Sequence, residues 1–560
     1  LPAALHEAEA RRYQIAEAAR VPLRDGNTLT AVVVQPRRLV GRQPTVLEFT
    51  IYANAGNRAV ALEAASQGFV GVVATTRGKR GSAGPIFPFE SDGADAHDLV
   101  DWIARQPWSN GAVGMIGGSY SGFTQWAAAK TRHPALRTIV PTAAVAPGID
   151  FPRENGIVLS FQYAWSRYVG SDGLLDETSY ADAARWARID SSWFARGSTY
   201  RALDQIDGAP NALWRRWLDH PAYDGYWQAM IPTAAEFAQI DIPVLSITGY
   251  FDGAQPGTLH YYRTHLANRP TADHTLLIGP WDHFGAQRRP SAVLHGLRID
   301  SVANVDVIGV VYAWMAHVLR GAPRPVLLAD RVNFQVHGSN HWRHAPSLAA
   351  MSTDTLTLLL RSGTRGDDHR LVLGDDPSAA DGSVIGTLDV DMADRTQRSS
   401  TFIAPGADTT LDRTNGLVFV SEPLATATTL SGALTGTLTV RLNARDVDLA
   451  VELYERTADG EYSQLSYHLG RASLARDPGR RTLLVPGMTE SFPITGARVT
   501  SRVVQAASRL VAVVRVNKNA QSQLNYGSGK DPSDETIADA VRSLQLQLLS
   551  GSRLRVPVLR

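Results

Sequence analysis

Apolar residues in the first half of the chain gather in short continuous runs, with longer stretches of helical character between them. A strand that is buried on both faces is apolar at every position rather than at alternate ones. Such strands alternating with helices are typical of a parallel sheet that helices cover on both faces. The candidate strands are residues 46–49, 69–74, 113–116, 138–140, 244–248 and 275–278.

The segment before these strands has a different pattern. Residues 21–23 and 29–34 flank Asp25-Gly26-Asn27, and two apolar runs around such a turn predict a β-hairpin. The opening residues 2–20 are rich in Ala, Glu and Arg, so we expect them to be partly helical.

Residues 147–240 interrupt the alternation of strands and helices. They contain no strand candidate of comparable quality, which predicts a helical insertion sitting on the sheet as a cap. Many aromatic residues of the chain fall here, namely Trp165, Trp186, Trp193, Trp214, Trp217, Trp227, Tyr163, Tyr168, Tyr223 and Tyr226.

Beyond about residue 340 the apolar residues recur at every second position. Many Gly, Asp and Asn turns separate these stretches, and the combination predicts an antiparallel β-sandwich. A chain of 560 residues is also too long for a single core, so about three domains are expected. The alternating sets include Val447, Leu449, Val451 and Leu453; Leu356, Leu358 and Leu360; and Leu554, Val556 and Val558.

The composition excludes several classes of protein. An apolar fraction of 44%, a charged fraction of 19% and a net charge of +1 are those of an ordinary folded protein. The near-neutral charge, with no basic run, argues against a nucleic-acid partner. No apolar stretch approaches the ~18–20 residues that a membrane-spanning helix needs, so we expect no membrane partner.

The chain has no cysteine, which excludes disulfides, thiolate catalysis and iron–sulfur clusters. It has no H-E-x-x-H motif either, so we expect no cofactor and no catalytic metal, while a structural calcium ion stays open. The compartment stays open too, with a periplasmic or secreted location favoured over a cytoplasmic one. Leu1 is not an initiator methionine, which we expect to reflect trimming or processing.

The candidate chemistry begins at Gly117-Gly118-Ser119-Tyr120-Ser121-Gly122, between the strand at 113–116 and a helical stretch at 123–130. A serine among small residues at a strand-to-helix junction is the nucleophile-elbow signature of serine hydrolases. The last position of the usual G-x-S-x-G pattern is here Ser121. An ordinary βα loop is the alternative interpretation of this segment alone.

A serine nucleophile needs a base and a group that orients the base. In the α/β-hydrolase order the acid and then the histidine follow the serine, each past the end of a strand. Asp252 follows the run 244–248, and His283 follows the run 275–278. Asp252 could alternatively be a solvated turn residue before Gly253.

Stabilisation of an oxyanion is the remaining requirement. The backbone N–H of Tyr120 is the expected first donor, since it follows the nucleophile. Tyr52, just after the run 46–49, could supply its phenolic O–H as the second donor. A packing tyrosine is the alternative for Tyr52.

Together these residues resemble the cocaine-esterase-like hydrolases, which include X-prolyl dipeptidyl peptidases and α-amino acid ester hydrolases. Tyr52, Ser119, Tyr120, Asp252 and His283 fall on the family's functional positions, and its turn G-x-S-Y-x-G accommodates Ser121. The matching stretches are Tyr52-Ala53-Asn54, Thr76-Arg77-Gly78-Lys79-Arg80-Gly81-Ser82-Ala83-Gly84, Gly117 to Gly122 with Thr124-Gln125-Trp126, Gly249-Tyr250-Phe251-Asp252-Gly253, Gly279-Pro280-Trp281-Asp282-His283, Asn340-His341-Trp342, and Asn525-Tyr526-Gly527 to Asp534-Glu535.

The resemblance implies an α/β fold of three parts. These are an α/β-hydrolase core at 1–146 and 241–340, a helical cap at 147–240, and a C-terminal jelly-roll β-sandwich at 341–560. It also implies a Ser-His-Asp serine esterase that works through an acyl-enzyme on a small ester or amide. The oligomeric state stays open, a homo-oligomer included.

The substrate is less defined. Asp252 is followed by the uncharged Gly253, Ala254 and Gln255, which offer little to a substrate ammonium group, so a carboxylic ester with an uncharged or aromatic acyl part is favoured. Glu154 and Asp150 are the remaining acids that could bind such a cation. The alternatives are an α-amino acid ester hydrolase or acylase, an X-prolyl dipeptidyl peptidase, or a binding protein without activity.

Two aromatic residues are candidates for the substrate pocket. Trp165 is similar in placement to a cap tryptophan that lines the acyl pocket in the family, although ordinary packing within the cap is equally compatible with its position. Phe251, directly before Asp252, is the second candidate.

Overall fold

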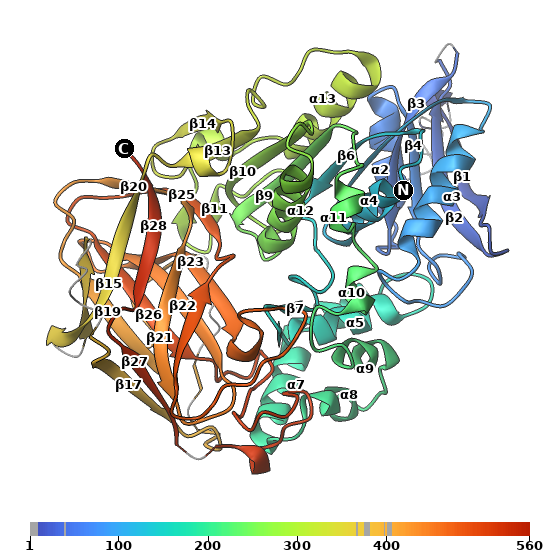
Figure 1. Cartoon of the computed structure of the whole chain (residues 1–560). Coiled ribbons are helices and arrows are strands. Elements are labelled where there is room, and N and C mark those ends of the chain that lie inside the picture. The colour runs from blue at the N-terminus through green and yellow to red at the C-terminus, as the bar shows by residue number, and fades with distance from the viewer. Residues whose placement is uncertain are drawn as a thin grey trace.

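The computed structural model of the chain describes residue 9 and residues 11–38, 41–365, 368–374, 381–396, 398–399, 406–541 and 543–560. A largely parallel sheet with helices on both faces carries a helical unit at one end, and a strand-rich domain packs beside both (Figure 1). The site described below forms where the sheet meets the helical unit.

The core sheet has ten strands in the order β1-β2-β4-β3-β5-β6-β9-β10-β13-β14. The pairs from β4 through β3, β5, β6, β9 and β10 to β13 are parallel, while β1, β2 and β14 are antiparallel to their neighbours. The strands are β1 Tyr13–Pro22, β2 Thr28–Pro36, β3 Gln43–Thr50, β4 Val70–Thr75, β5 Ser109–Gly118, β6 Leu136–Thr142, β9 Val244–Phe251, β10 His274–Asp282, β13 Val332–Val336 and β14 His341–Ala345.

Helices cover both faces of this sheet, which explains its continuously apolar strands. On β10, Leu277 packs in one cluster with α13, whereas its neighbours Leu276 and Ile278 pack with α12 on the other face. The stacked rings of Trp126 and Tyr261, 4.8 Å apart, join α4 to α12. The helices are α2 Asn57–Ser66, α3 Asp92–Ala104, α4 Tyr120–Thr131, α12 Gln255–Asn268 and α13 Val307–Arg320.

The N-terminal hairpin is confirmed, and the partly helical character expected of residues 2–20 is found at residues 9, 11 and 12 but not at residues 13–20, which are strand. Strand β1 begins at Tyr13 and pairs with β2 around the Asp25-Gly26-Asn27 turn. Helical backbone is limited to residues 9, 11 and 12, and residues 2–8 and 10 lie outside the described residues. The long pairing with β2 outweighs the modest helix propensity of the Ala- and Glu-rich sequence.

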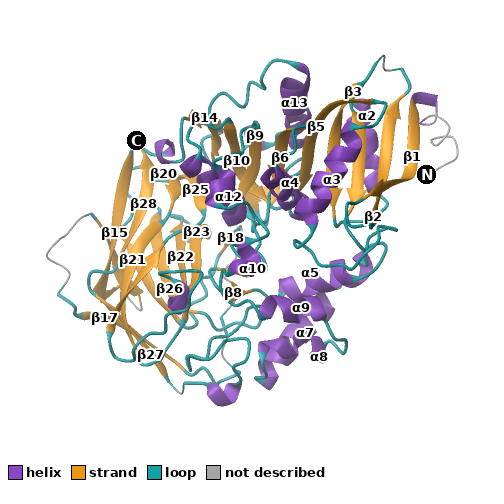
Figure 2. Cartoon of the chain, turned by 45° about the vertical axis from the view of Figure 1, so that its right-hand side comes forward, coloured by secondary structure: helices purple, strands orange, loops and turns teal. Residues whose placement is uncertain are grey.

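Seven helices and a two-stranded hairpin separate β6 from β9. Four helices of this unit, α5, α7, α8 and α9, cluster at one end of the core sheet (Figure 2), and the side chains of Trp193, Trp214, Trp217 and Trp227 are buried within it. The elements are β7 Arg153–Glu154, β8 Ile157–Val158, α5 Phe161–Gly170, α6 Glu177–Tyr180, α7 Ala183–Arg196, α8 Leu203–Ile206, α9 Ala212–Leu218, α10 Gly225–Gln228 and α11 Ala234–Phe237. We call this unit the cap.

The C-terminal domain consists of strands, and the alternating sequence patterns lie on them. Leu449, Val451 and Leu453 are buried, yet the intervening Asp448 and Glu452 are buried as well, because arginines pair with both. The jelly-roll order of these strands stays a prediction. They are β15 Asp354–Arg365, β16 Asp368–Leu373, β17 Val384–Val390, β18 Ala407–Asp408, β19 Gly416–Ser421, β20 Thr428–Ala433, β21 Thr435–Leu442, β22 Asp448–Arg456, β23 Tyr462–Arg471, β24 Thr489–Ile494, β25 Val499–Val504, β26 Arg509–Val516, β27 Leu544–Leu549 and β28 Arg553–Leu559.

A small hairpin, β11 Val293–Leu294 and β12 Leu297–Arg298, follows β10.

Within the described part of the chain, every helix falls short of the length and apolarity that crossing a membrane requires.

Candidate active site

Ser119 occupies a sharp turn between β5, which ends at Gly118, and α4, which begins at Tyr120. Its backbone has φ 59° and ψ −120°, a strained conformation for a residue with a side chain. The neighbours must be small, since a Cβ at Gly117 would lie 2.5 Å from Ser121 Cβ and one at Gly122 would lie 2.7 Å from Ala144 Cβ. The turn therefore has the geometry of a nucleophile elbow.

Asp252 and His283 form a hydrogen-bonded pair at the same edge of the sheet. Asp252 follows β9 and His283 follows β10, and His283 Nδ1 lies 2.8 Å from Asp252 Oδ1. The carboxylate is 1% exposed and also accepts hydrogen bonds from the Thr248 hydroxyl at 2.7 Å and from the Ala254 N–H at 2.9 Å. These two donors hold the carboxylate while the imidazole remains partly open to solvent.

The turn after β10 packs against the elbow. A Cβ at Gly118 would lie 2.1 Å from Gln287 Oε1, and Gln287 Nε2 donates to the His283 carbonyl at 2.7 Å. The described residues show no direct hydrogen bond between Ser119 Oγ and His283. Such contacts are often long in ligand-free enzymes and shorten when substrate binds.

Tyr52 lies directly over the Ser119 hydroxyl. Its O–H donates to Ser119 Oγ at 3.2 Å and accepts from Trp165 Nε1 at 3.3 Å. Burial raises the pKa of Tyr52, while the bonds to Ser119, Trp165 and the Tyr120 backbone N–H oppose the shift. Tyr52 therefore keeps its proton near neutral pH, and its hydroxyl lies against both Ser119 Oγ and the backbone N–H of Tyr120.

The side chain of Tyr120 has a role that the sequence did not indicate. Its hydroxyl donates to Asp92 Oδ2 at 2.8 Å and accepts from the Phe89 N–H at 3.2 Å. Burial raises the pKa of Asp92 to about 7, more than the hydrogen bond from Tyr120 lowers it. This buried contact ties the first turn of α4 to α3 and so fixes the helix that begins at the elbow.

Glu48 is a second residue that sequence reasoning missed. Ser121 Oγ lies 3.0 Å from Glu48 Oε1 and 2.8 Å from Thr50 Oγ1, both on β3. Burial raises the pKa of Glu48 to about 7, although the bond from Ser121 opposes the shift. A single acidic residue inside the apolar run 46–49 was the signal that could have identified it.

Glu154 and Asp150, the acids considered for cation binding, are both engaged elsewhere. Glu154 forms a two-pronged ion pair with Arg498 of the C-terminal domain, and Arg498 also reaches the Gly253 carbonyl at 3.4 Å. Asp150 accepts from the backbone N–H of Ala146 and of Gly257, at 2.8 and 2.7 Å.

Of the two residues expected to line the substrate pocket, Trp165 lies beside Tyr52 and Phe251 lies at a separate small cavity. Trp165 contacts Tyr52 as described but is only 6% exposed, and its ring centroid lies 6.0 Å from those of both Phe89 and Trp217, which also contact each other. Phe251 lines a small cavity of about 20 Å³ together with Asp252, Tyr467 and Arg498. Among the described residues, no group of three or more His, Asp or Glu side chains is arranged to hold a metal ion.

Comparison with known proteins supports the fold and the class of chemistry. Residues 25–285 match the profile of the X-Pro dipeptidyl-peptidase (S15 family), and residues 326–503 match that of the X-Pro dipeptidyl-peptidase C-terminal non-catalytic domain. Cocaine esterase from Rhodococcus sp. (strain MB1 Bresler) is 27% identical over an alignment 566 positions long, which covers 92% of this chain and 93% of that enzyme.

Two solved structures are similar over nearly the whole chain. An aminopeptidase from the marine sediment archaeon Thaumarchaeota archaeon superposes with a TM-score of 0.81 at 20% identity, and an α-amino acid ester hydrolase with 0.79 at 22%. Both alignments cover 98% of this chain and 97% of the other. They confirm the predicted fold class, and the esterase and peptidase relatives set aside the alternative of a binding protein without activity. The chain thus belongs to the S15 family of serine hydrolases and is an α/β-hydrolase enzyme.

Proposed function

We propose that this enzyme cleaves carboxylic esters through an acyl-enzyme on Ser119, with Asp252 and His283 as the rest of the triad. The observation that carries the proposal is the Tyr52 hydroxyl at 3.2 Å from Ser119 Oγ, with the Tyr120 backbone N–H against the same hydroxyl. Two such donors beside a strained serine can stabilise the oxyanion of a tetrahedral intermediate.

The contact between Asp252 and His283 bears on which nitrogen of the imidazole carries the proton. A carboxylate only accepts, so the 2.8 Å contact supports an imidazole proton on Nδ1, and Nε2 then acts as the base. His283 then takes the Ser119 proton as Oγ attacks the substrate carbonyl, and Asp252 stabilises the imidazolium. The Tyr52 O–H and the Tyr120 N–H hold the charge that develops on the carbonyl oxygen.

The second half of the cycle uses the same groups. The imidazolium of His283 protonates the departing alcohol, which leaves the acyl group on Ser119. Water then attacks the acyl carbon, His283 accepts its proton, and collapse of the second tetrahedral intermediate releases the carboxylic acid.

The charges around the site favour an uncharged acyl part. A substrate ammonium needs a free carboxylate, but Glu154 is neutralised by Arg498 and Asp150 is held by two backbone N–H groups. Glu48 and Asp92, beside the elbow, are bonded to Ser121 and Tyr120, and burial favours their neutral forms. Simple aryl or alkyl esters are therefore the expected substrates.

The second candidate is hydrolysis of α-amino esters or of X-Pro amides. The profile match at residues 25–285 favours it, since that profile describes an X-Pro dipeptidyl-peptidase. It requires a cation site close to Ser119, which distinguishes it from the first candidate.

A substrate panel on the full chain separates the two. We expect kcat/KM for p-nitrophenyl acetate, butyrate and benzoate to exceed that for matched α-amino esters and X-Pro p-nitroanilides. Ser119→Ala is expected to abolish turnover, and wild-type enzyme to release a burst of about one equivalent of p-nitrophenol when deacylation is slow. A preference for the amino esters or X-Pro amides would overturn the assignment of the substrate.

A further inference from the structure

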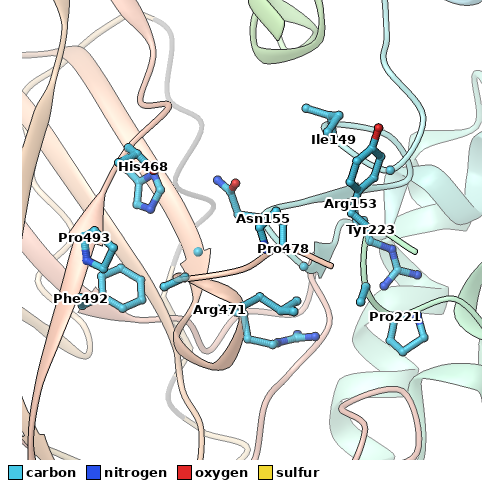
Figure 3. Close-up of a pocket in the computed structure, with 17 residues that line it drawn as sticks. Ile149, Arg153, Asn155, Pro221, Tyr223, His468, Arg471, Pro478, Phe492 and Pro493 are labelled. Atoms are coloured by element: carbon cyan, nitrogen blue, oxygen red, sulfur yellow. The ribbon is translucent and has the colours of Figure 1, made fainter. Parts of the chain in front are cut away.

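A cavity of about 170 Å³ lies between the cap and the C-terminal domain. From the cap side it is lined by Ile149, Arg153 and Tyr223, and from the domain side by His468, Arg471 and Phe492 (Figure 3). Ser119, Tyr52, Asp252 and His283 are not among its lining residues, so it is distinct from the site described above.

Arg153 sets this cavity apart electrostatically. Within the described ranges, four arginines are buried, and three of them have a carboxylate oxygen at 2.8 Å. Arg153 has no carboxylate oxygen of the described residues within 4.0 Å. A buried charge is normally paired, so an unpaired guanidinium at a cavity wall indicates a missing partner. The paired arginines are Arg471 with Asp448, Arg498 with Glu154, and Arg515 with Glu452.

The contacts that Arg153 does make leave much of its donor capacity unused. One terminal nitrogen donates to the Trp217 carbonyl at 2.6 Å, and the guanidinium lies 5.8 Å from the ring centroid of Trp227. Its Nε is buried and has no hydrogen-bond partner among the described residues, although the side chain is only 2% exposed. Burial lowers the pKa of Arg153 to about 9, so the group still carries its charge at neutral pH.

The surrounding charges do not neutralise it. Asp531 and Asp224 act on Arg153 only from beyond ion-pair distance, and the nearby Arg471 and Arg201 oppose them. Burial lowers the pKa of His468 to about 4, so this imidazole is neutral at physiological pH and adds no charge of its own.

Apart from Asn155, Tyr223 and Thr495, the remaining walls are apolar. Leu474, Pro478, Phe492 and Pro493 from the C-terminal domain face Ile149 and Pro221 of the cap. A bare inorganic anion would leave these surfaces against water, whereas an organic anion would cover them.

We propose that this cavity binds a small organic carboxylate, with the carboxylate on Arg153 and an apolar body between Phe492 and the proline walls. Such a ligand contacts both the cap and the C-terminal domain and therefore stabilises their association. The proposal does not depend on the esterase assignment.

Isothermal titration calorimetry of the full chain with benzoate tests it, with benzamide as a neutral probe of the same shape. We expect saturable binding of one benzoate, and at least about tenfold weaker binding of benzamide, since a hydrogen bond to a charged group contributes about 1.5–3 kcal/mol. Arg153→Met should weaken benzoate binding by a similar factor, whereas Arg188→Met, an exposed charge removal on α7, should not change it.

A second variant keeps the test decisive if Arg153→Met folds poorly. Ala222→Phe places a ring in the cavity and leaves Arg153 in place, and it should also abolish benzoate binding. Absence of saturable binding to the wild-type chain would overturn the proposal. Equal affinity in wild type, Arg153→Met and Ala222→Phe would also overturn it, because benzoate would then occupy another site, such as the pocket at Ser119.

Discussion

The hydroxyl of Tyr52 donates a hydrogen bond to the hydroxyl oxygen of Ser119 across 3.2 Å. Tyr52 follows β3 and Ser119 follows β5, its parallel neighbour, so the sheet itself brings a proton donor to the oxygen that is proposed to attack. Trp165 of the cap donates to the same phenolic oxygen, which links the orientation of Tyr52 to the packing of α5.

Tyr52→Phe should lower kcat for p-nitrophenyl esters by about 10²–10³-fold with little change in KM. The variant removes one proposed oxyanion donor, and the loss of such a donor typically costs about 3–4 kcal/mol in the barrier. Tyr168→Phe is the matched control, since the Tyr168 ring lies 6.4 Å from the Tyr52 ring but, in the described part of the chain, forms no hydrogen bond with Ser119. Equal kcat in wild type and Tyr52→Phe would contradict the role given to Tyr52.

Trp165→Phe should lower kcat about two- to tenfold, because it removes a neutral hydrogen bond of ~0.5–1.5 kcal/mol that orients Tyr52. Trp217→Phe is the control, since Trp217 stacks on Trp165 while its own Nε1 has no partner among the described residues. Steady-state kinetics of Trp165→Phe in the Tyr52→Phe background tests whether Trp165 acts through Tyr52. If Trp165 acts through Tyr52, its effect on kcat should vanish there, and a persistent effect would show that it acts by another route.

Arg498→Met should destabilise the enzyme by about 3–5 kcal/mol, since it leaves Glu154 buried without its partner. The pair of Arg476, which is exposed, and Glu490 is the control, and Arg476→Met should cost about 0–1 kcal/mol. Urea unfolding followed by tryptophan fluorescence measures both. Because Arg498 also bonds the Gly253 carbonyl next to Asp252, kcat should fall in Arg498→Met alone. Similar stability losses in the two variants would contradict this account of the buried pair.

Glu48→Gln should stabilise the enzyme at pH 8 by up to ~3 kcal/mol and much less at pH 4.5. The pKa of Glu48 is raised from 4.5 to about 7, so the folded state holds a proton that the unfolded state has released between these pH values. Stability therefore falls as pH rises from 4.5 to 7, and the neutral amide removes that loss while still accepting from Ser121. Thermal unfolding across this pH range, with the exposed Glu461→Gln as control, tests the prediction. A constant difference between wild type and Glu48→Gln at all pH values would refute it.

The features that could be predicted from the sequence are those that depend on short, local patterns of residues. The core strands are continuously apolar, and Ser119, Asp252 and His283 each follow one of them at the expected edge of the sheet. The same logic placed Tyr52 after the neighbouring strand. A parallel sheet brings the residues that follow its strands close together, because the carboxyl ends of its strands share an edge.

Contacts between residues far apart in the chain could not be predicted from local sequence patterns. The partner of Glu154 is Arg498, 344 residues later, so an acid that looked free to bind a cation is already neutralised. The burial of Glu48 and Asp92 depends on packing between elements, which no local pattern records. Residues 13–20 are strand rather than helix for a related reason, since their pairing with β2 across the hairpin decides their conformation.

A crystal structure of the enzyme inhibited by an aryl phosphonate tests the central claim most directly. The account predicts phosphorus bonded to Ser119 Oγ, a phosphonyl oxygen within about 3 Å of both the Tyr52 hydroxyl and the Tyr120 nitrogen, and His283 Nε2 within hydrogen-bond reach of Oγ. An adduct on a different residue would contradict it, as would an imidazole at His283 that fails to reach Oγ even through one water molecule.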